Sequence, residues 1–377
     1  MRIGVDIRSL NTKHLTGVGH YSLHILEELA RQDKNNQYFL LSSGCKAGDN
    51  HFLPKSDNFN YHHIKQANKW LNFNFILGRG KDFSMVGDRG VDIFWLPNIN
   101  FLKINAKTPL IITIHDLSWL QNKAFYDYKR IWWHRLVGVK RLLQRADHII
   151  AVSHNTKRDL IRFFNLPADK ISVVYSGISA VVMDQERAKR ELAGSSLPDK
   201  YFLYLGTLEP RKNIISIIQA FAMFHNDQPD YHLLIVGGRG WAYKNILQAI
   251  KDKPYIHYLN YLSSPKKDAL YFLSQGLIWP SFYEGFGFPP LEAISQGAPV
   301  ITSYKSSLPE VLGQAALYVD PYNVADIYQA LKLITDNSDL RQQLYDSGQK
   351  ILKPTWSATA QEMIKIFEKI KRYENSN

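Results

Sequence analysis

Two glutamates that flank a glycine-containing loop are the residues of this sequence best suited to bind a polar ligand. Glu284 and Glu292 lie within residues 281–297, directly after the short apolar run 276–279. This pattern predicts a strand, a glycine loop and a helix that starts at the carboxyl edge of a parallel sheet. The free N–H groups of such a helix start suit a diphosphate, and Gly285 and Gly287 let the backbone approach it closely.

The two carboxylates would be repelled by a diphosphate unless they accepted hydrogen bonds from hydroxyl groups. Sugar and ribose hydroxyls are therefore the expected partners of Glu284 and Glu292. The alternative for Glu292 is that it only complements the helix dipole.

A second group of charged residues follows another strand-like segment. Arg211 and Lys212 are adjacent in residues 205–213, after the strand expected at residues 201–205. Two cations at the carboxyl edge of a sheet suit the two phosphates and the charge that grows as a diphosphate leaves. The alternative is a solvated cationic turn beside Asn213.

The motif around the two glutamates resembles the donor site of the retaining family 4 glycosyltransferases, which have the GT-B fold. The resemblance lies in Glu284-Gly-Phe-Gly-Phe-Pro-Pro-Leu-Glu292-Ala and in the following Gly297-Ala-Pro-Val. It extends over most of the chain and is weakest between residues 45 and 92. Thr207 stands where the family often has an arginine, so we expect Arg211 to take that role beside Lys212.

The resemblance implies a role for each site residue. Glu292 would bind ribose hydroxyls, Glu284 would bind sugar hydroxyls, and Arg211 with Lys212 would hold the diphosphate. The expected catalytic residues are His115, Arg211, Lys212 and Glu284. The expected donor-binding residues are Gly17, Gly19, Gly206, Tyr261, Phe286, Gly287, Phe288, Leu291 and Glu292.

The first half of the chain supplies fewer candidates. Gly17-Val18-Gly19 resembles the family's first glycine loop, although a plain turn is an equal alternative. His115 follows the strand expected at residues 110–114 and matches a family histidine that faces the transferred sugar; a structural role is its alternative. Tyr21 and Trp119 are expected to contact the acceptor.

No metal ion or other cofactor is expected at this site. The sequence contains no Asp-X-Asp motif, and its histidines lack metal-ligand spacing. A metal-dependent transferase would need such carboxylates to hold a divalent ion on the diphosphate. Arg211, Lys212 and a helix start are expected to replace the ion.

Two short runs indicate the donor sugar. Residues 208–213 (Leu-Glu-Pro-Arg-Lys-Asn) and 307–311 (Ser-Leu-Pro-Glu-Val) look most like mannosyltransferases of bacterial surface polysaccharides, such as the lipopolysaccharide O antigen. GDP-mannose is therefore the expected donor, and a saccharide, in particular a lipid-linked one, the expected acceptor. A UDP-glucose or UDP-N-acetylglucosamine donor remains an alternative, and so does a nucleotide-sugar epimerase with the same architecture.

The elements that must position these residues alternate between strands and helices, which predicts an α/β fold of two Rossmann-like, doubly wound parallel sheets with a cleft between the domains. Strand-like segments in the first half are residues 2–7, 38–41, 93–96, 110–114, 148–152 and 171–174. Those in the second half are residues 201–205, 232–236, 256–259, 276–279, 300–302 and 316–319. We expect an acceptor domain over residues 1–190, a nucleotide-sugar domain over 191–355, and a helix over 356–377 that packs back on the first domain.

Two segments of the first half leave alternatives open. Residues 128–145 contain six cations, no acidic residue and an apolar stripe, so as a helix they suit either an anionic membrane surface or packing on their own sheet. Residues 57–92 have no clear period and are expected to form a mobile loop. That loop could bind an acceptor or be a surface insertion.

Composition limits the remaining choices. The 377 residues are 45% hydrophobic and 21% charged, which is typical of a folded globular protein. The single cysteine, Cys45, and the lack of a long apolar run predict a cytoplasmic protein, located in part at the inner face of the membrane. The net charge of +12 fits a phosphorylated ligand or an anionic membrane, and no nucleic-acid-binding motif accompanies it.

Overall fold

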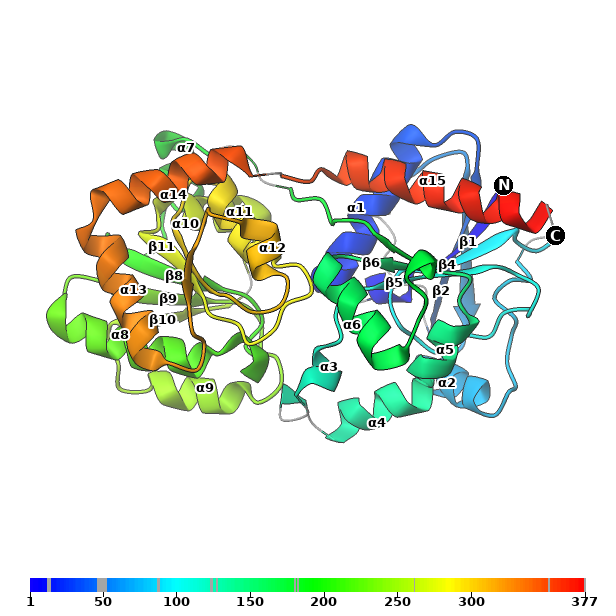
Figure 1. Cartoon of the computed structure of the whole chain (residues 1–377), viewed down its shortest axis with the longest axis horizontal. Coiled ribbons are helices and arrows are strands. Elements are labelled where there is room, and N and C mark those ends of the chain that lie inside the picture. The colour runs from blue at the N-terminus through cyan, green and yellow to red at the C-terminus, as the bar shows by residue number, and fades with distance from the viewer. Residues whose placement is uncertain are drawn as a thin grey trace. The chain divides into compact units, whose positions relative to one another are not determined.

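The computed structural model describes the chain except for residues 12–14, 46–52, 87–88, 123–124, 127, 180, 182, 261, 352 and 376–377. The chain forms two compact units (Figure 1). Unit 1 comprises Met1–Gln121, Tyr128–Gly177 and Pro354–Asn377, and unit 2 comprises Asn122–Asp127 and Ile178–Lys353. Each unit is a parallel sheet with helices on both faces, which confirms the predicted α/β class.

Unit 1 contains a seven-stranded parallel sheet in the order β3-β2-β1-β4-β5-β6-β7. Its strands are β1 (Arg2–Asp6), β2 (Gln37–Gly44), β3 (Phe59–Lys65), β4 (Ile93–Leu96), β5 (Leu110–Ile114), β6 (His148–Ala151) and β7 (Ile171–Val173). Its helices are η1 (Arg8–Leu10), α1 (Gly17–Gln32), α2 (Asn68–Ile76), α3 (Ser118–Gln121), α4 (Tyr128–Val137), α5 (Val139–Arg145), α6 (His154–Phe164), η3 (Ala168–Lys170) and α15 (Trp356–Asn375).

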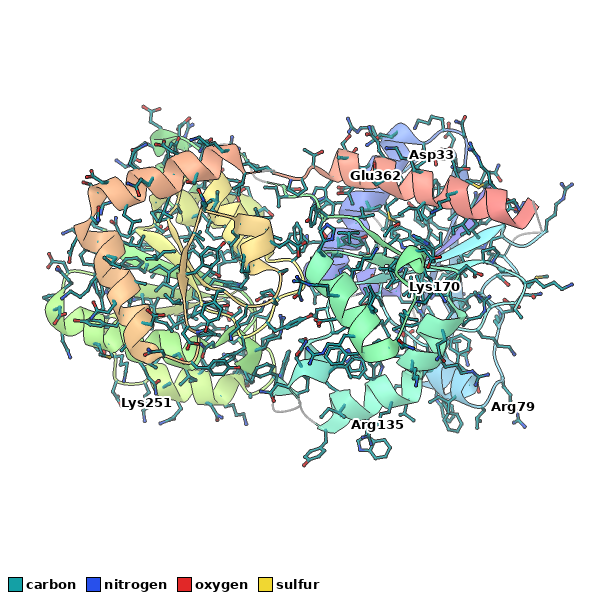
Figure 2. All side chains as sticks on the ribbon, viewed as in Figure 1. Asp33, Arg79, Arg135, Lys170, Lys251 and Glu362 are labelled. Carbon is teal, nitrogen blue, oxygen red and sulfur yellow. The ribbon has the colours of Figure 1, made fainter. Side chains whose placement is uncertain are left out.

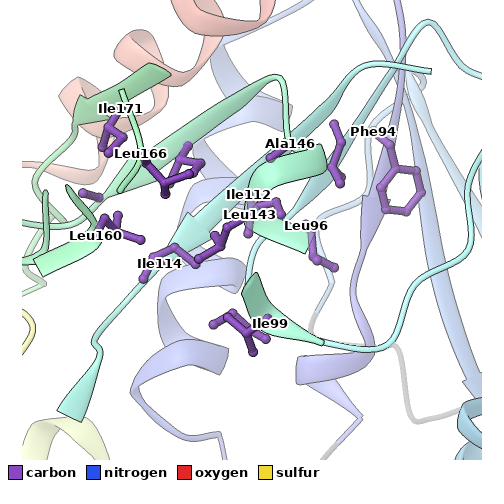
Figure 3. Close-up of a cluster of buried hydrophobic side chains, with 14 of the residues drawn as sticks. Phe94, Leu96, Ile99, Ile112, Ile114, Leu143, Ala146, Leu160, Leu166 and Ile171 are labelled. Carbon is purple, nitrogen blue, oxygen red and sulfur yellow. The ribbon is translucent and has the colours of Figure 1, made fainter. Parts of the chain in front are cut away.

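The core of unit 1 forms because its central strands are continuous apolar runs, as expected for strands that are covered on both faces. Every residue of β4 and β5 is buried. On one face Leu96, Ile112 and Ile114 pack with Leu143 of α5 and Leu160 of α6 (Figure 3). This packing fixes the strand ends, from which the candidate loops start.

Unit 2 contains a six-stranded parallel sheet in the order β10-β9-β8-β11-β12-β13. Its strands are β8 (Tyr201–Leu205), β9 (His232–Val236), β10 (Ile256–Leu259), β11 (Gly276–Trp279), β12 (Val300–Ser303) and β13 (Leu317–Val319). Its helices are α7 (Gln185–Glu191), η4 (Pro210–Lys212), α8 (Ile214–Asp227), α9 (Tyr243–Ile250), α10 (Ser264–Leu273), α11 (Phe288–Ser295), α12 (Leu308–Leu312), α13 (Val324–Asp336) and α14 (Ser338–Lys350).

The C-terminal helix α15 belongs to unit 1, where it lies beside α1 (Figure 1). Its Phe367 packs against Trp95 of β4, and Thr359 Oγ1 donates to the carbonyl oxygen of Tyr175 at 2.8 Å. Its first residue, Trp356, lies so close to Gly177 that a Cβ on that glycine would be 2.2 Å from the Trp356 backbone nitrogen. Gly177 is therefore required for the close approach of the two segments.

The units divide between Gly177 and Ile178, earlier than the boundary expected near residue 190. The connecting segment is hydrogen-bonded to unit 2: the Val181 amide donates to Asp268 at 3.3 Å, and Gln296 donates to the Val181 carbonyl at 2.7 Å. Residues 122–127 also belong to unit 2, where Phe125 stacks on Phe282. Sequence pattern does not reveal these contacts because they join segments far apart in the chain.

Two local predictions for unit 1 are corrected. Residues 57–92 are not a plain loop, because they contain β3, which pairs in parallel with β2, and α2. Residues 128–145 are not one helix, because Gly138 has a φ of 67° and separates α4 from α5.

The residues of α4 and α5 face in two directions. Val139 and Leu143 are buried, and Trp133 and Val137 pack partly against the core. On the other side of α4, Tyr128, Trp132 and Leu136 are exposed by 83%, 57% and 52%, with the exposed Arg135 next to them (Figure 2). No helix in the described part of the chain is both long and apolar enough to span a bilayer.

Candidate functional site

The candidate site lies where two neighbouring strands of unit 2 end. β8 pairs in parallel with β11, so the loops after Leu205 and Trp279 leave the same edge of the sheet. The first loop leads into η4, which carries Arg211 and Lys212. The second leads through Glu284 to the start of α11. The strand order thus brings together residues that are more than 70 positions apart in sequence.

Glu284 forms ion pairs with both cations of η4. Its Oε2 accepts a hydrogen bond from Arg211 Nη1 at 3.0 Å, and its Oε1 accepts one from Lys212 Nζ at 2.6 Å. Trp279 Nε1 donates to the same Oε1 at 3.1 Å, and Lys212 Nζ lies 4.6 Å from the centre of the Trp279 ring. Arg211 also donates to Glu209 Oε1 at 2.7 Å and to the Tyr283 carbonyl oxygen at 2.7 Å.

Burial makes this network electrostatically strong. Arg211, Lys212, Glu209 and Glu284 are each less than 10% exposed. Burial alone would raise the pKa of Glu284, but the positive charges of Lys212 and Arg211 outweigh it and lower that pKa to about 2. Burial and the nearby Arg211 lower the pKa of Lys212, against the opposing effect of Glu284. The two cations and two carboxylates compensate each other, and the network fixes the positions of the cationic groups.

The start of α11 lies at this edge of the sheet, and of its first three residues only Phe288 carries a backbone N–H, because Pro289 and Pro290 have none. Gly287 precedes the helix with a φ of 100°, and as a glycine it supplies no side-chain cap. A Cβ at Gly287 would lie 2.9 Å from Leu308 Cδ2, so the position needs glycine for both conformation and space. The positive end of the helix dipole favours an anion at this position.

Two serines that the sequence analysis missed shape the loop before α11. The Glu284 amide donates to Ser306 Oγ at 2.7 Å, and Ser307 Oγ donates to the carbonyl oxygens of Glu284 at 3.0 Å and Phe286 at 3.2 Å. Both serines follow β12, the neighbour of β11 in the sheet. Ser307 is the first residue of the run 307–311, on which the expectation of a mannose donor rests. The sequence of that run does not indicate that Ser307 bonds to the loop before α11.

Glu292 lies in α11 and is held by α10. Its Oε1 accepts from Lys267 Nζ at 2.6 Å, and its Oε2 accepts from Tyr271 Oη at 3.2 Å. The carboxylate is partly exposed. These contacts hold Glu292 in place by a second element. Neither Lys267 nor Tyr271 belongs to a recognisable motif.

The other expected donor residues of unit 2 have varied environments. A Cβ at Gly206 would lie 2.6 Å from the Trp279 ring, so this glycine permits the contact between the ends of β8 and β11. Phe286 is buried, Phe288 opens α11, and Leu291 is packed in the core. Tyr261 lies outside the described residues.

Some of the expected site residues of unit 1 contact one another. Gly17 and Gly19 form the first turn of α1, where Thr16 Oγ1 accepts from the Gly19 amide at 3.4 Å. Tyr21 of α1 is fully buried, and its ring packs edge-on against His115 with centroids 4.6 Å apart. An acceptor contact from Tyr21 would require this packing to change.

His115 is held in one orientation. Its Nε2 donates to the Pro97 carbonyl oxygen at 2.8 Å, because a carbonyl can only accept. Burial lowers the pKa of His115, so the ring is neutral at pH 7. Trp119 lies partly buried and stacks on His134, with centroids 4.3 Å apart. In the described ranges no group of three or more His, Cys, Asp or Glu residues is arranged to hold a metal ion.

Two protein families match the chain, one for each half. "Glycosyltransferase Family 4" matches residues 15–181, and "Glycosyl transferases group 1" matches residues 185–351. Together with the two parallel-sheet units, these matches define a GT-B glycosyltransferase. The chain belongs to the family 4 type of these enzymes.

Similar curated proteins include O-antigen mannosyltransferases. O-antigen chain mannosyltransferase B of Escherichia coli is 34% identical over 248 residues, which are 62% of this chain and 64% of that protein. O-antigen chain mannosyltransferase RfbU of Salmonella typhimurium is 29% identical over 65% of this chain and 70% of its own length. The serotype-specific mannosyltransferase WbdA of Escherichia coli is 27% identical over 71% of this chain but only 34% of its own length. The matches thus span less than two thirds of the first of these relatives and about a third of WbdA.

Solved structures share the fold over nearly the whole chain. A sucrose-phosphate synthase from Thermosynechococcus elongatus has a TM-score of 0.74 at 18% identity and covers 98% of this chain and 99% of its own. HepE of Anabaena in complex with UDP-glucose has a TM-score of 0.73 at 14% identity, with 98% and 100% covered. At these identities the likeness concerns the fold alone.

Proposed function

We propose that this glycosyltransferase transfers mannose from GDP-mannose to a saccharide acceptor with retention of anomeric configuration. The observation that carries the proposal is the buried network of Arg211, Lys212 and Glu284 beside the start of α11. This arrangement provides fixed cationic donors and the positive end of a helix dipole on one edge of the sheet, which suits a diphosphate.

In this proposal the donor binds to unit 2. Arg211 and Lys212 contact the diphosphate, and the positive end of the α11 dipole faces it. Glu284 holds the two cations in place and offers its remaining lone pair, on Oε2, to a sugar hydroxyl. Glu292, positioned by Lys267 and Tyr271, accepts from the ribose hydroxyls.

The reaction needs no carboxylate nucleophile. The bond between the anomeric carbon and the leaving phosphate oxygen breaks, and the acceptor oxygen bonds to that carbon on the same face. The acceptor proton passes to an oxygen of the leaving phosphate. Arg211 and Lys212 stabilise the negative charge that grows there, a task that elsewhere a divalent ion performs.

Mannose is proposed because the similar curated proteins include three O-antigen or serotype-specific mannosyltransferases. The structural neighbour HepE is described with UDP-glucose, so a UDP-sugar is the competing donor. A nucleotide-sugar epimerase is the less favoured alternative, and it would convert the donor without any acceptor.

A lipid-linked acceptor at the inner face of the cytoplasmic membrane is also part of the proposal. Its support is the outer side of α4, where Tyr128, Trp132 and Leu136 recur every four residues and are exposed among Lys129, Arg130 and Arg135. Aromatic rings flanked by cations are typical of helices that lie in an anionic membrane interface.

The proposal is tested by incubating the protein with GDP-mannose, UDP-glucose or UDP-N-acetylglucosamine in EDTA, with and without a lipid-linked saccharide from an O-antigen pathway. We expect release of the nucleoside diphosphate from GDP-mannose but from neither UDP-sugar. The release should be much faster with acceptor, and the product should be α-linked by NMR because the donor is α-linked. Preference for a UDP-sugar would reject mannose. Donor conversion without acceptor would favour an epimerase, and a β-linked product would reject retention.

A further inference from the structure

A polar cavity in unit 1 is separate from every residue assigned above. It has a volume of about 130 Å³, below the roughly 300–1,000 Å³ that is usual for drug-sized ligands, which limits it to a small ligand. It is lined by four asparagines, Asn68, Asn72, Asn98 and Asn100, together with Ser9 and the buried pair Asp6 and Arg8.

The lining residues come from several elements at one edge of the sheet. Arg8 lies in η1, directly after β1, and Asn98 and Asn100 follow β4, which neighbours β1. Asn68 and Asn72 are four residues apart in α2 and therefore lie on the same face of that helix. The loop that follows β4 also holds His115, because the carbonyl oxygen of Pro97, next to Asn98, accepts from His115 Nε2.

The two charges of the cavity neutralise each other. Arg8 Nε donates to Asp6 Oδ1 at 2.9 Å, and Arg8 Nη2 donates to Asp6 Oδ2 at 2.6 Å. Arg8 Nη2 also donates to the Phe101 carbonyl oxygen at 2.6 Å. Both side chains are only 4% exposed, so the pair is fixed and adds no net charge to the cavity.

The asparagines leave hydrogen-bonding groups without partners in the part of the chain that the structure describes. Asn72 Oδ1 is buried and has no hydrogen-bond partner there. Asn68 accepts from Ser43 through Oδ1, and Asn100 accepts from the Phe101 amide through Oδ1, which leaves the amide N–H groups of both side chains for a ligand. Each side-chain amide both donates and accepts, as does a hydroxyl group.

We infer that this cavity binds a neutral sugar unit of the acceptor, one without a phosphate or carboxylate group. The inference rests on the proposed transfer to a saccharide and adds the class of acceptor to it. A ring with several hydroxyls matches a wall of uncharged groups that donate and accept at once. An anionic sugar would meet no uncompensated cation among the lining residues, because Asp6 already pairs with Arg8.

The inference is tested by saturation-transfer NMR with methyl α-D-mannopyranoside, and in parallel with the methyl glycosides of glucose, galactose and N-acetylglucosamine. The variants are Asn72→Leu and Asn98→Leu, which keep side-chain size but remove the amide. The control is Asn74→Leu, in the same helix but not in the cavity. GDP binding is measured on every variant by calorimetry, and circular dichroism checks the fold.

We expect the wild type and Asn74→Leu to bind at least one neutral glycoside, and each cavity variant to bind it roughly ten-fold more weakly. GDP affinity should be the same in all four proteins. Unchanged glycoside binding in both cavity variants, no binding of any glycoside by the wild type, or equally tight binding of mannose 6-phosphate through Asn72 and Asn98 would overturn the inference. If the wild type did not bind GDP, that result would instead contradict the proposed function.

Discussion

Replacing Glu284 with glutamine should destabilise unit 2 strongly at neutral pH and much less in acid. Glutamine keeps the size of the side chain but removes the charge that pairs with Arg211 and Lys212. Both cations would remain buried, with Glu209 still paired to Arg211. Leaving a buried charge without its partner typically costs about 3–5 kcal/mol.

The lowered pKa gives a similar magnitude and the sign of the pH dependence. The pKa of Glu284 falls from an ordinary 4.5 to about 2, which corresponds to about 3 kcal/mol of stability. Because the folded value is the lower one, this stability is present above pH 4.5 and is lost as the pH falls towards 2. The difference between wild type and Glu284→Gln should therefore fall from about 3 kcal/mol at pH 7 to about half of that at pH 3.

Urea unfolding followed by circular dichroism at pH 7 and pH 3 measures this difference, and contributions from unit 1 cancel between the two proteins. The matched control is Glu186→Gln, an exposed glutamate in the first turn of α7 in unit 2. It should cost less than about 1 kcal/mol. A loss for Glu284→Gln that is no larger than the control, or that does not shrink in acid, would refute the reasoning.

Two further predictions concern unit 1. Gly177→Ala should lower the thermal midpoint, with a cost of about 1–3 kcal/mol, because the new Cβ would overlap the backbone of Trp356; Gly17→Ala, which has open space around it, should not. A thermal midpoint for Gly177→Ala equal to that of Gly17→Ala would contradict the close contact. Trp132→Glu should weaken sedimentation with vesicles of phosphatidylglycerol and phosphatidylcholine at least several-fold, whereas Leu333→Glu, at another exposed apolar position in unit 2, should not. Equal binding by both variants would remove α4 from the membrane proposal.

Much of the fold could be predicted because the central strands are buried on both faces and therefore read as continuous apolar runs. Residues 110–114 and 201–205 show this directly. The edge strand β3 could not be predicted in this way, because only its first residue, Phe59, is buried and the rest are polar or partly exposed. The break at Gly138 was missed because the apolar stripe of residues 128–145 continues through the glycine.

The candidate site was predictable only to the level of its loops. Parallel strands that end at one edge explain why Arg211, Lys212 and Glu284 were expected near each other. These residues pair directly because β8 lies next to β11 in the sheet. Neither the motif with Arg211 and Lys212 nor the motif with Glu284 indicates that strand order. The same limit explains why Lys267, the partner of Glu292, was missed.

The most direct test of the central claim is calorimetric titration of GDP and GMP, in EDTA, into the wild type and into the variant with Arg211→Ala and Lys212→Ala. We predict that the wild type binds GDP at least ten-fold more tightly than GMP, and that the double variant loses this preference, because each charge-assisted contact contributes roughly 1.5–3 kcal/mol. Equal affinity of the wild type for GDP and GMP, or an unchanged preference in a folded double variant, would contradict a diphosphate site at these two residues.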